Sequence, residues 1–167
     1  MFRSMSRILV LALLSLFVAA PQLLAQQDEK KVFADQLTGL GNFLLQSAEL
    51  ARSRGQEESV RSFAETIFQT QQPFMATLQE SVDQEGLQAS PELSQEYQAK
   101  LQALQTAEQN QFDNAYFSAQ VVALESMIQL MQGYQESGEA GALKTFAANQ
   151  IGGLRTLYVR AEEFSVP

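Results

Sequence analysis

Glu125 is the one carboxylate of this sequence that lies within a strongly apolar stretch. The apolar residues 121–124 precede it, and Met127 and Ile128 follow it. A carboxyl group held inside a helical core could bind a metal ion or carry a proton. Buried carboxylates without a partner are rare, however, and a largely apolar helix still has one edge that faces water. The sequence therefore favours a solvent-facing Glu125, and the interior alternative stays open.

Met127 and Met131 stand four residues apart in the same stretch. At helical spacing they lie on one face and could offer two thioether ligands to Cu(I). Flexible methionine side chains fill gaps in protein cores far more often than they bind copper. We therefore expect core packing from this pair.

Three glutamines are further candidates for interior polar groups, because they lie on or near apolar stripes: Gln71, Gln120 and Gln150. Buried together, their amides could form a layer that fixes the register of the helices, provided that each amide finds partners. The alternative is that they lie at the edge of the apolar stripes. The sequence does not decide between the two.

The composition excludes most catalytic chemistry, because the 167 residues include no His, no Cys and no Trp. The absence of Cys excludes disulfides, catalytic thiols, iron–sulfur clusters and thiolate zinc sites. The absence of His removes the commonest metal ligand and the usual general base. A di-iron site of the usual Glu-x-x-His type cannot occur either. We therefore expect no enzyme activity, no catalytic residues, no metal ligands and no cofactor.

The charge balance is acidic, with 11 basic and 19 acidic residues and a net charge of −8. An acidic surface opposes binding to the phosphate backbones of nucleic acids and to anionic lipid headgroups. Nucleic acid is therefore not an expected partner.

The first residues have the three-part layout of a secretory signal peptide. Arg3 and Arg7 precede an apolar run over residues 8–20, and the small residue Ala25 precedes a polar segment. The sequence predicts a signal peptide over residues 1–25, with cleavage after Ala25.

An uncleaved membrane anchor is the alternative to a cleaved signal. The apolar run is short for a span of about 20 residues, and Pro21 and Gln22 follow it. A Cys-free exported chain suits an oxidising compartment, so we expect a periplasmic protein, with association with the outer membrane as an open alternative. Membrane contact is expected only through an uncleaved signal or loose association.

Beyond a flexible segment over residues 26–31, apolar residues recur at helical spacing throughout a single domain, residues 32–164. Gly55 and Gly86 end the first two helices, and Ser90-Pro91-Glu92 has the pattern of a helix N-cap. The predicted helices cover residues 32–54, 57–85, 91–108, 112–136 and 141–164.

Bends are expected at Pro73, which cannot donate a backbone hydrogen bond, and at Gly152 and Gly153.

An internal repeat also supports the division into helices. Residues 60–64 match residues 143–147 in character at every position, at an offset of 83 residues, and the same offset aligns Gly55 with Gly138. Two helical hairpins joined by a crossover that carries the short helix predict an all-α, ferritin-like four-helix bundle.

Several short motifs in these helices are shared with a known family. They are Phe63-Ala64 with Ile67, Phe112-Asp113 with Tyr116 and Gln120, and Phe146-Ala147 ahead of Gly152-Gly153. With them the chain resembles a bacterial family of exported proteins of unknown function, often labelled membrane or outer-membrane proteins. The resemblance implies a ferritin-like fold.

The chain departs from that family where histidines are usual. The resemblance places an Asp-His pair on Thr70-Gln71 and further histidines near Leu124 and Leu157. Any metal binding or proton transfer by those histidines in relatives is therefore lost here.

Together these features predict an exported, non-catalytic helical bundle that acts through binding or has a structural or stress-related role. One alternative is a ferritin-like protein that binds metal through carboxylates or Met, which requires inward carboxylates from at least two helices. The other is a homodimer or protein-interaction module, which requires an exposed apolar patch of several hundred Å².

Overall fold

The computed structural model describes residues 19–165 of the chain, and the side chains of residues 28–165. This part of the chain is helical and contains no strand. Its helices are α1 (Ala19–Arg54), α2 (Glu58–Gln84), α3 (Gln95–Thr106), α4 (Gln109–Ser137) and α5 (Ala142–Ser165).

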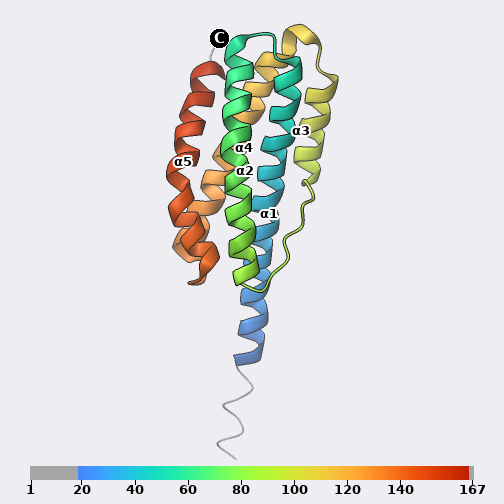
Figure 1. Cartoon of the computed structure of the whole chain (residues 1–167). Helices are drawn as coiled ribbons and strands as arrows, with labels where there is room; N and C mark the ends of the chain where they lie inside the picture. The colour runs from blue at the N-terminus through green and yellow to red at the C-terminus, as the bar shows by residue number, and fades with distance from the viewer. Residues whose placement is uncertain (1–18, 166–167) are drawn as a thin grey trace, which may run out of the picture.

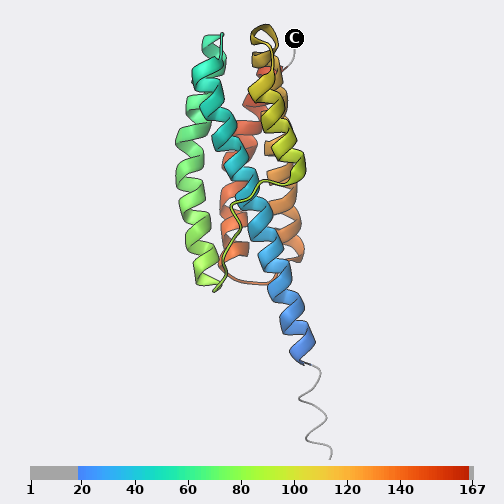
Figure 2. The same cartoon turned by 90° about the vertical axis from the view of Figure 1, so that its right-hand side faces the viewer.

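Four long helices form an antiparallel bundle, and the short α3 lies against one side of it (Figure 1). α1 packs on α2 and α4, and α5 packs on α4 and α2, so each long helix has two long neighbours. The segment between α2 and α3 climbs across α1 from one end of the bundle toward the other (Figure 2). The predicted all-α four-helix bundle with a short crossover helix is confirmed.

The core follows the predicted helical stripes, because 3.6-residue periodicity brings apolar side chains to one face of each helix. Aromatic rings are prominent in it, and those of Phe63, Tyr116 and Phe117 lie within 6.3 Å of one another, centroid to centroid. Tyr97, Leu101 and Leu104 of α3 are also buried. α3 therefore packs against α1 and α4 through this narrow apolar face.

α3 begins later than predicted, at Gln95. Its N-cap is Ser94, whose hydroxyl accepts from the backbone N–H of Tyr97. Ser90 instead donates its backbone N–H to Asp35 of α1, and Asn42 of α1 donates to the carbonyl of Pro91. Because α1 binds these backbone groups, residues 90–93 stay extended along it, and the predicted cap at Ser90 is wrong.

α1 begins earlier than predicted and runs through residues 26–31, where the sequence predicts a flexible segment. Lys30 lies in this extension, and its ammonium group contacts Glu85 at 2.7 Å and Glu139 at 3.0 Å at the end of the bundle. The first turns of α1 project beyond the bundle (Figure 1). The predicted cleavage position, Ala25, lies in this helix, and the basic and most of the apolar part of the predicted signal lie outside the described residues.

The two halves of the internal repeat make matching contacts. Gly55 and Gly138 each donate their backbone N–H to the carbonyl four residues earlier, at 2.9 and 2.8 Å. Six residues after each glycine, a cation donates to the glycine's carbonyl: Arg61 at 2.8 Å and Lys144 at 2.9 Å. The two copies of the sequence repeat therefore also share the hydrogen bonds that precede α2 and α5.

α2 continues without interruption through Pro73, and α5 continues through Gly152 and Gly153. The bends expected at these residues stay predictions. None of the helices described is long and apolar enough to cross a membrane.

Candidate functional site

Glu125 lies on the exposed surface of α4, and its carboxylate accepts a hydrogen bond of 3.1 Å from the Gln129 amide. The interior alternative for Glu125 is therefore wrong. Glu125 lies at the edge of α4 that faces water, which is the position that the sequence favours. Met127 and Met131 are fully buried in the apolar core. In the part of the chain that the structure describes, no group of three or more acidic residues is placed to hold a metal ion.

Gln120 is fully buried and pairs with a residue of α1 rather than with the other glutamines. Its Nε2 donates to the Ser47 hydroxyl at 2.8 Å, and that hydroxyl donates to the carbonyl of Phe43 at 2.7 Å. The Oε1 atom of Gln120 has no hydrogen-bond partner. This short chain of hydrogen bonds joins α1 to α4.

The Tyr116 hydroxyl, one turn before Gln120, is also buried without a partner, and burial raises its pKa. An unpaired buried hydroxyl destabilises the fold, so Tyr116→Phe is expected to raise the free energy of unfolding by about 1 kcal/mol. Tyr97→Phe is the matched control, because the Tyr97 hydroxyl lies 3.0 Å from the Ser126 hydroxyl and its loss should destabilise. Urea unfolding of both variants measures the two signs, and destabilisation by Tyr116→Phe would contradict the prediction.

Gln71 and Gln150 lie on facing helices, at a cavity of about 370 Å³ between α2 and α5. Phe74, Leu154 and Leu157 supply its apolar walls, and three threonines also line it. The lining residues are Thr66, Thr70, Gln71 and Phe74 of α2, and Gln150, Gly153, Leu154, Thr156, Leu157 and Arg160 of α5. This α2–α5 cavity is the candidate functional site.

Gln71 is the polar group that distinguishes the α2–α5 cavity. It is only 1% exposed, and its Oε1 has no hydrogen-bond partner. The neighbouring Thr70 hydroxyl is not available to it, because that hydroxyl donates to the carbonyl of Thr66 at 2.8 Å. A buried acceptor without a donor costs free energy in the empty protein. This oxygen has almost no accessible surface, so it is sealed from the cavity as well as from water.

Arg160 brings a positive charge to the same cavity. Its guanidinium lies 3.5 Å from the Thr66 hydroxyl and 6.0 Å from the centroid of the Phe63 ring, and both contacts are weak. The residues that line the cavity include no Asp or Glu. The cavity therefore combines apolar walls with one cation.

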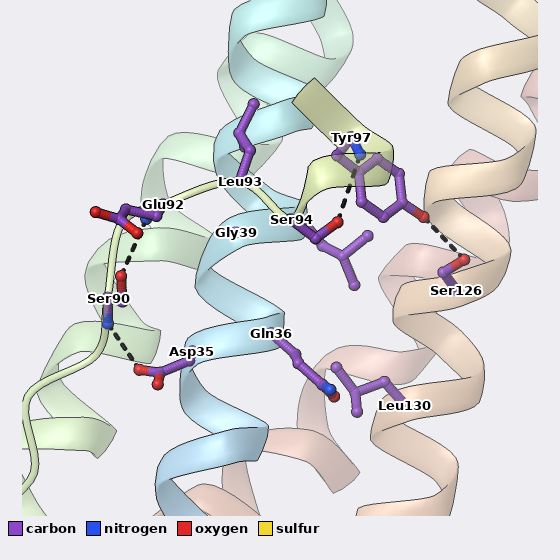
Figure 3. A pocket seen from close by; sticks show the side chains of 11 residues that line it. Asp35, Gln36, Gly39, Ser90, Glu92, Leu93, Ser94, Tyr97, Ser126 and Leu130 are labelled. Atoms are coloured by element: carbon purple, nitrogen blue, oxygen red, sulfur yellow. Dashed lines mark hydrogen bonds between the residues drawn. The ribbon is translucent and has the colours of Figure 1, made fainter. Parts of the chain in front are cut away.

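A larger cavity, of about 480 Å³, lies under the crossover segment, between it and α1, α3 and α4 (Figure 3). Two of its polar side chains, those of Asp35 and Tyr97, have partners within the protein. Asp35 accepts from the Ser90 N–H at 2.7 Å, and the Tyr97 hydroxyl donates to Ser126. These hydrogen bonds hold the crossover against α1 and hold α3 against α4.

Gly39 of α1 allows the crossover to pass close to the helix. A Cβ atom at this position would lie 2.8 Å from the backbone carbonyl oxygen of Glu92. The backbone cannot yield as a flexible side chain does, so a glycine is needed where the crossover touches α1.

The histidine positions that the family resemblance implies are not all brought together. Gln71 and Leu157 both line the α2–α5 cavity, whereas Leu124 is fully buried in α4 and does not line it. The sequence analysis missed Arg160. Its spacing of three residues from Leu157, on the same face of a helix, is the signal that could have found it.

Comparisons with known proteins place the chain in a family. A family model described as a domain of unknown function, DUF4142, matches residues 16–164 and so covers nearly the whole helical bundle. No curated protein and no solved structure matches the chain. The chain belongs to the DUF4142 family, a family defined by sequence and not by an activity.

Proposed function

We propose that this chain is an exported, periplasmic, non-catalytic protein with a ferritin-like bundle topology, and that it binds a small molecule in the α2–α5 cavity. The observation that carries the proposal is the cavity itself, which has a volume of about 370 Å³, apolar walls and a single charged residue in its lining, Arg160. Cavities of this size, mostly apolar with a few polar groups, are typical ligand sites. The signal-like residues 1–25 support export.

A non-catalytic role follows from the chemistry available at the cavity. Threonine, amide and guanidinium groups line it, and none of them is a general base near neutral pH. These groups can bind and orient a ligand through hydrogen bonds and charge. Binding is therefore the function that they support best.

Two neighbouring glycines make a direct test. Gly153 lines the cavity and Gly152 does not, and a Cβ atom at either position meets no other atom within 4 Å. Both are exposed residues of α5. Gly153→Phe should therefore occupy the cavity, whereas Gly152→Phe should leave it open at a similar cost to the helix.

The experiment is a fragment screen by ligand-observed NMR on protein purified from cells that express the full chain. We expect fragments that bind the parent and Gly152→Phe but not Gly153→Phe. A parent that binds no fragment, or binding that survives in Gly153→Phe, would refute the proposal. Mass spectrometry of the same purified protein tests export, because cleavage after Ala25 leaves Gln26 as the first residue.

A further inference from the structure

We propose that Met75 is a site of reversible oxidation, where a small peroxide converts the thioether into a sulfoxide and thereby loosens the contact between α1 and α2. This inference is independent of the ligand site, because Met75 is not among the residues that line the α2–α5 cavity.

Met75 carries the most accessible thioether of the helical bundle. The chain has no Cys, so methionine supplies its only sulfur atoms. Among the methionines that the structure describes, Met127 and Met131 are fully buried, whereas Met75 is partly exposed. An oxidant reaches a fully buried thioether only when the core opens. Met75 should therefore react first.

The place of Met75 follows from the apolar stripe of α2. Phe74 and Leu78 belong to the buried stripe, and Met75 lies at its edge and packs against the core. Its side chain reaches Gly41 of α1, where a Cβ atom would overlap the Met75 Sδ and lie 3.4 Å from its Cε. The sulfur therefore fills the space that a side chain at position 41 would take.

Oxidation changes this contact because a sulfoxide is polar, whereas a thioether is apolar. Gly41 has no side chain, and its backbone N–H lies in the interior of α1, where it already donates within the helix. The new oxygen therefore finds no donor at Gly41. A polar group held there would cost free energy, so the oxidised side chain should turn toward water and leave the contact between α1 and α2 unfilled.

The chemical step needs only the thioether and the peroxide. A lone pair of the sulfur attacks one peroxide oxygen, the S–O bond forms and the O–O bond breaks. The other oxygen leaves and takes up the proton of the transferred oxygen, so hydrogen peroxide gives water. The sulfur is oxidised and the peroxide is reduced. A methionine sulfoxide reductase, with a thiol as reductant, reverses the change.

The first test is a time course of the folded full chain in hydrogen peroxide, followed by peptide mass spectrometry. We expect sulfoxide to form at Met75 at least about tenfold faster than at Met127 and Met131. In urea the three residues should react at similar rates, because the fold no longer protects any of them. Equal rates in the folded protein would overturn the assignment.

Urea unfolding then measures the effect on the fold. Oxidation limited to Met75 should lower the midpoint of unfolding, and a methionine sulfoxide reductase with dithiothreitol should restore it. Met75→Leu should show no shift after the same treatment, whereas Met127→Leu, the matched control, should respond as the parent does. An unchanged midpoint in the oxidised parent, or a shift of the parent's size in Met75→Leu, would overturn the proposal.

Gly41→Ala tests the contact itself. The added Cβ should displace the Met75 sulfur, so this variant should start with a lower midpoint and oxidise at Met75 at least as fast as the parent. Oxidation should then lower its midpoint less than it lowers the parent's, because the contact is already lost. A shift as large as the parent's would show that oxidation does not act through Gly41.

Discussion

Arg54→Met should lower the free energy of unfolding by about 2–4 kcal/mol, because Arg54 binds the end of α3 to the end of α1. Its guanidinium donates to the carbonyls of Leu104 at 2.6 Å and Gln105 at 2.8 Å, and also to that of Ala107. The last carbonyls of a helix lack partners within it and attract cations. Loss of the guanidinium leaves these partly buried carbonyls unpaired.

Arg52→Met is the matched control for Arg54→Met. Both guanidinium groups lie over an aromatic ring, Arg52 over Phe68 at 4.7 Å and Arg54 over Phe112 at 4.5 Å. Arg52 differs in that its remaining contacts are exposed ion pairs, which contribute about 0–1 kcal/mol. Urea unfolding followed by circular dichroism measures both variants, and equal losses of stability would show that the carbonyl contacts contribute nothing.

Arg54→Lys should recover only part of the loss. A lysine ammonium is a compact group on a flexible chain, whereas the planar guanidinium spans several carbonyls at once. Full recovery would mean that the charge alone stabilises the end of α3.

The helices could be predicted because burial repeats with the helical period. The spacing of Val60, Ile67 and Phe74 predicts one apolar stripe, and all three residues are buried in α2. The start of α3 could not be predicted in the same way. Ser90-Pro91-Glu92 has the local pattern of a cap, but Asp35 and Asn42 on another helix bind this backbone, and the cap moves to Ser94.

Part of the candidate site could also be predicted from the helical spacing of apolar residues. Gln71 and Gln150 interrupt apolar stripes, so their positions could be identified from sequence, and the structure brings both to the α2–α5 cavity. Arg160 looks like an ordinary surface cation near the end of a helix. Its role depends on Thr66, 94 residues away, and one sequence contains no information on that pairing. The same applies to Gln120, whose partner Ser47 is 73 residues away.

Glu85 connects three segments at the opposite end of the bundle from Arg54. One carboxylate oxygen accepts from the backbone N–H of Ala142 at the start of α5, at 2.6 Å, and the other lies 2.7 Å from the Lys30 ammonium. Burial of the carboxyl group raises its pKa, but the hydrogen bonds from Lys30 and Ala142 outweigh it, so the pKa lies below the ordinary value of 4.5.

The sign of the pH dependence follows from this lowered pKa. Because the folded protein binds the proton of Glu85 less readily than the unfolded chain does, Glu85 stabilises the fold fully above pH 4.5. This stabilisation is lost as the pH falls through 4.5 toward the lower folded-state pKa.

Glu85→Gln should therefore lower the free energy of unfolding by about 1.5–3 kcal/mol at pH 7, because it removes the charge shared by Lys30 and the start of α5. The loss should shrink as the pH falls below 4.5, since protonated glutamic acid and glutamine then carry the same charge. Glu80→Gln, at an exposed position of α2, should change stability little at either pH. Urea unfolding at pH 7 and pH 3 gives both differences, and a loss at Glu85 that is equal at the two pH values would show that packing, not charge, is what this carboxylate contributes.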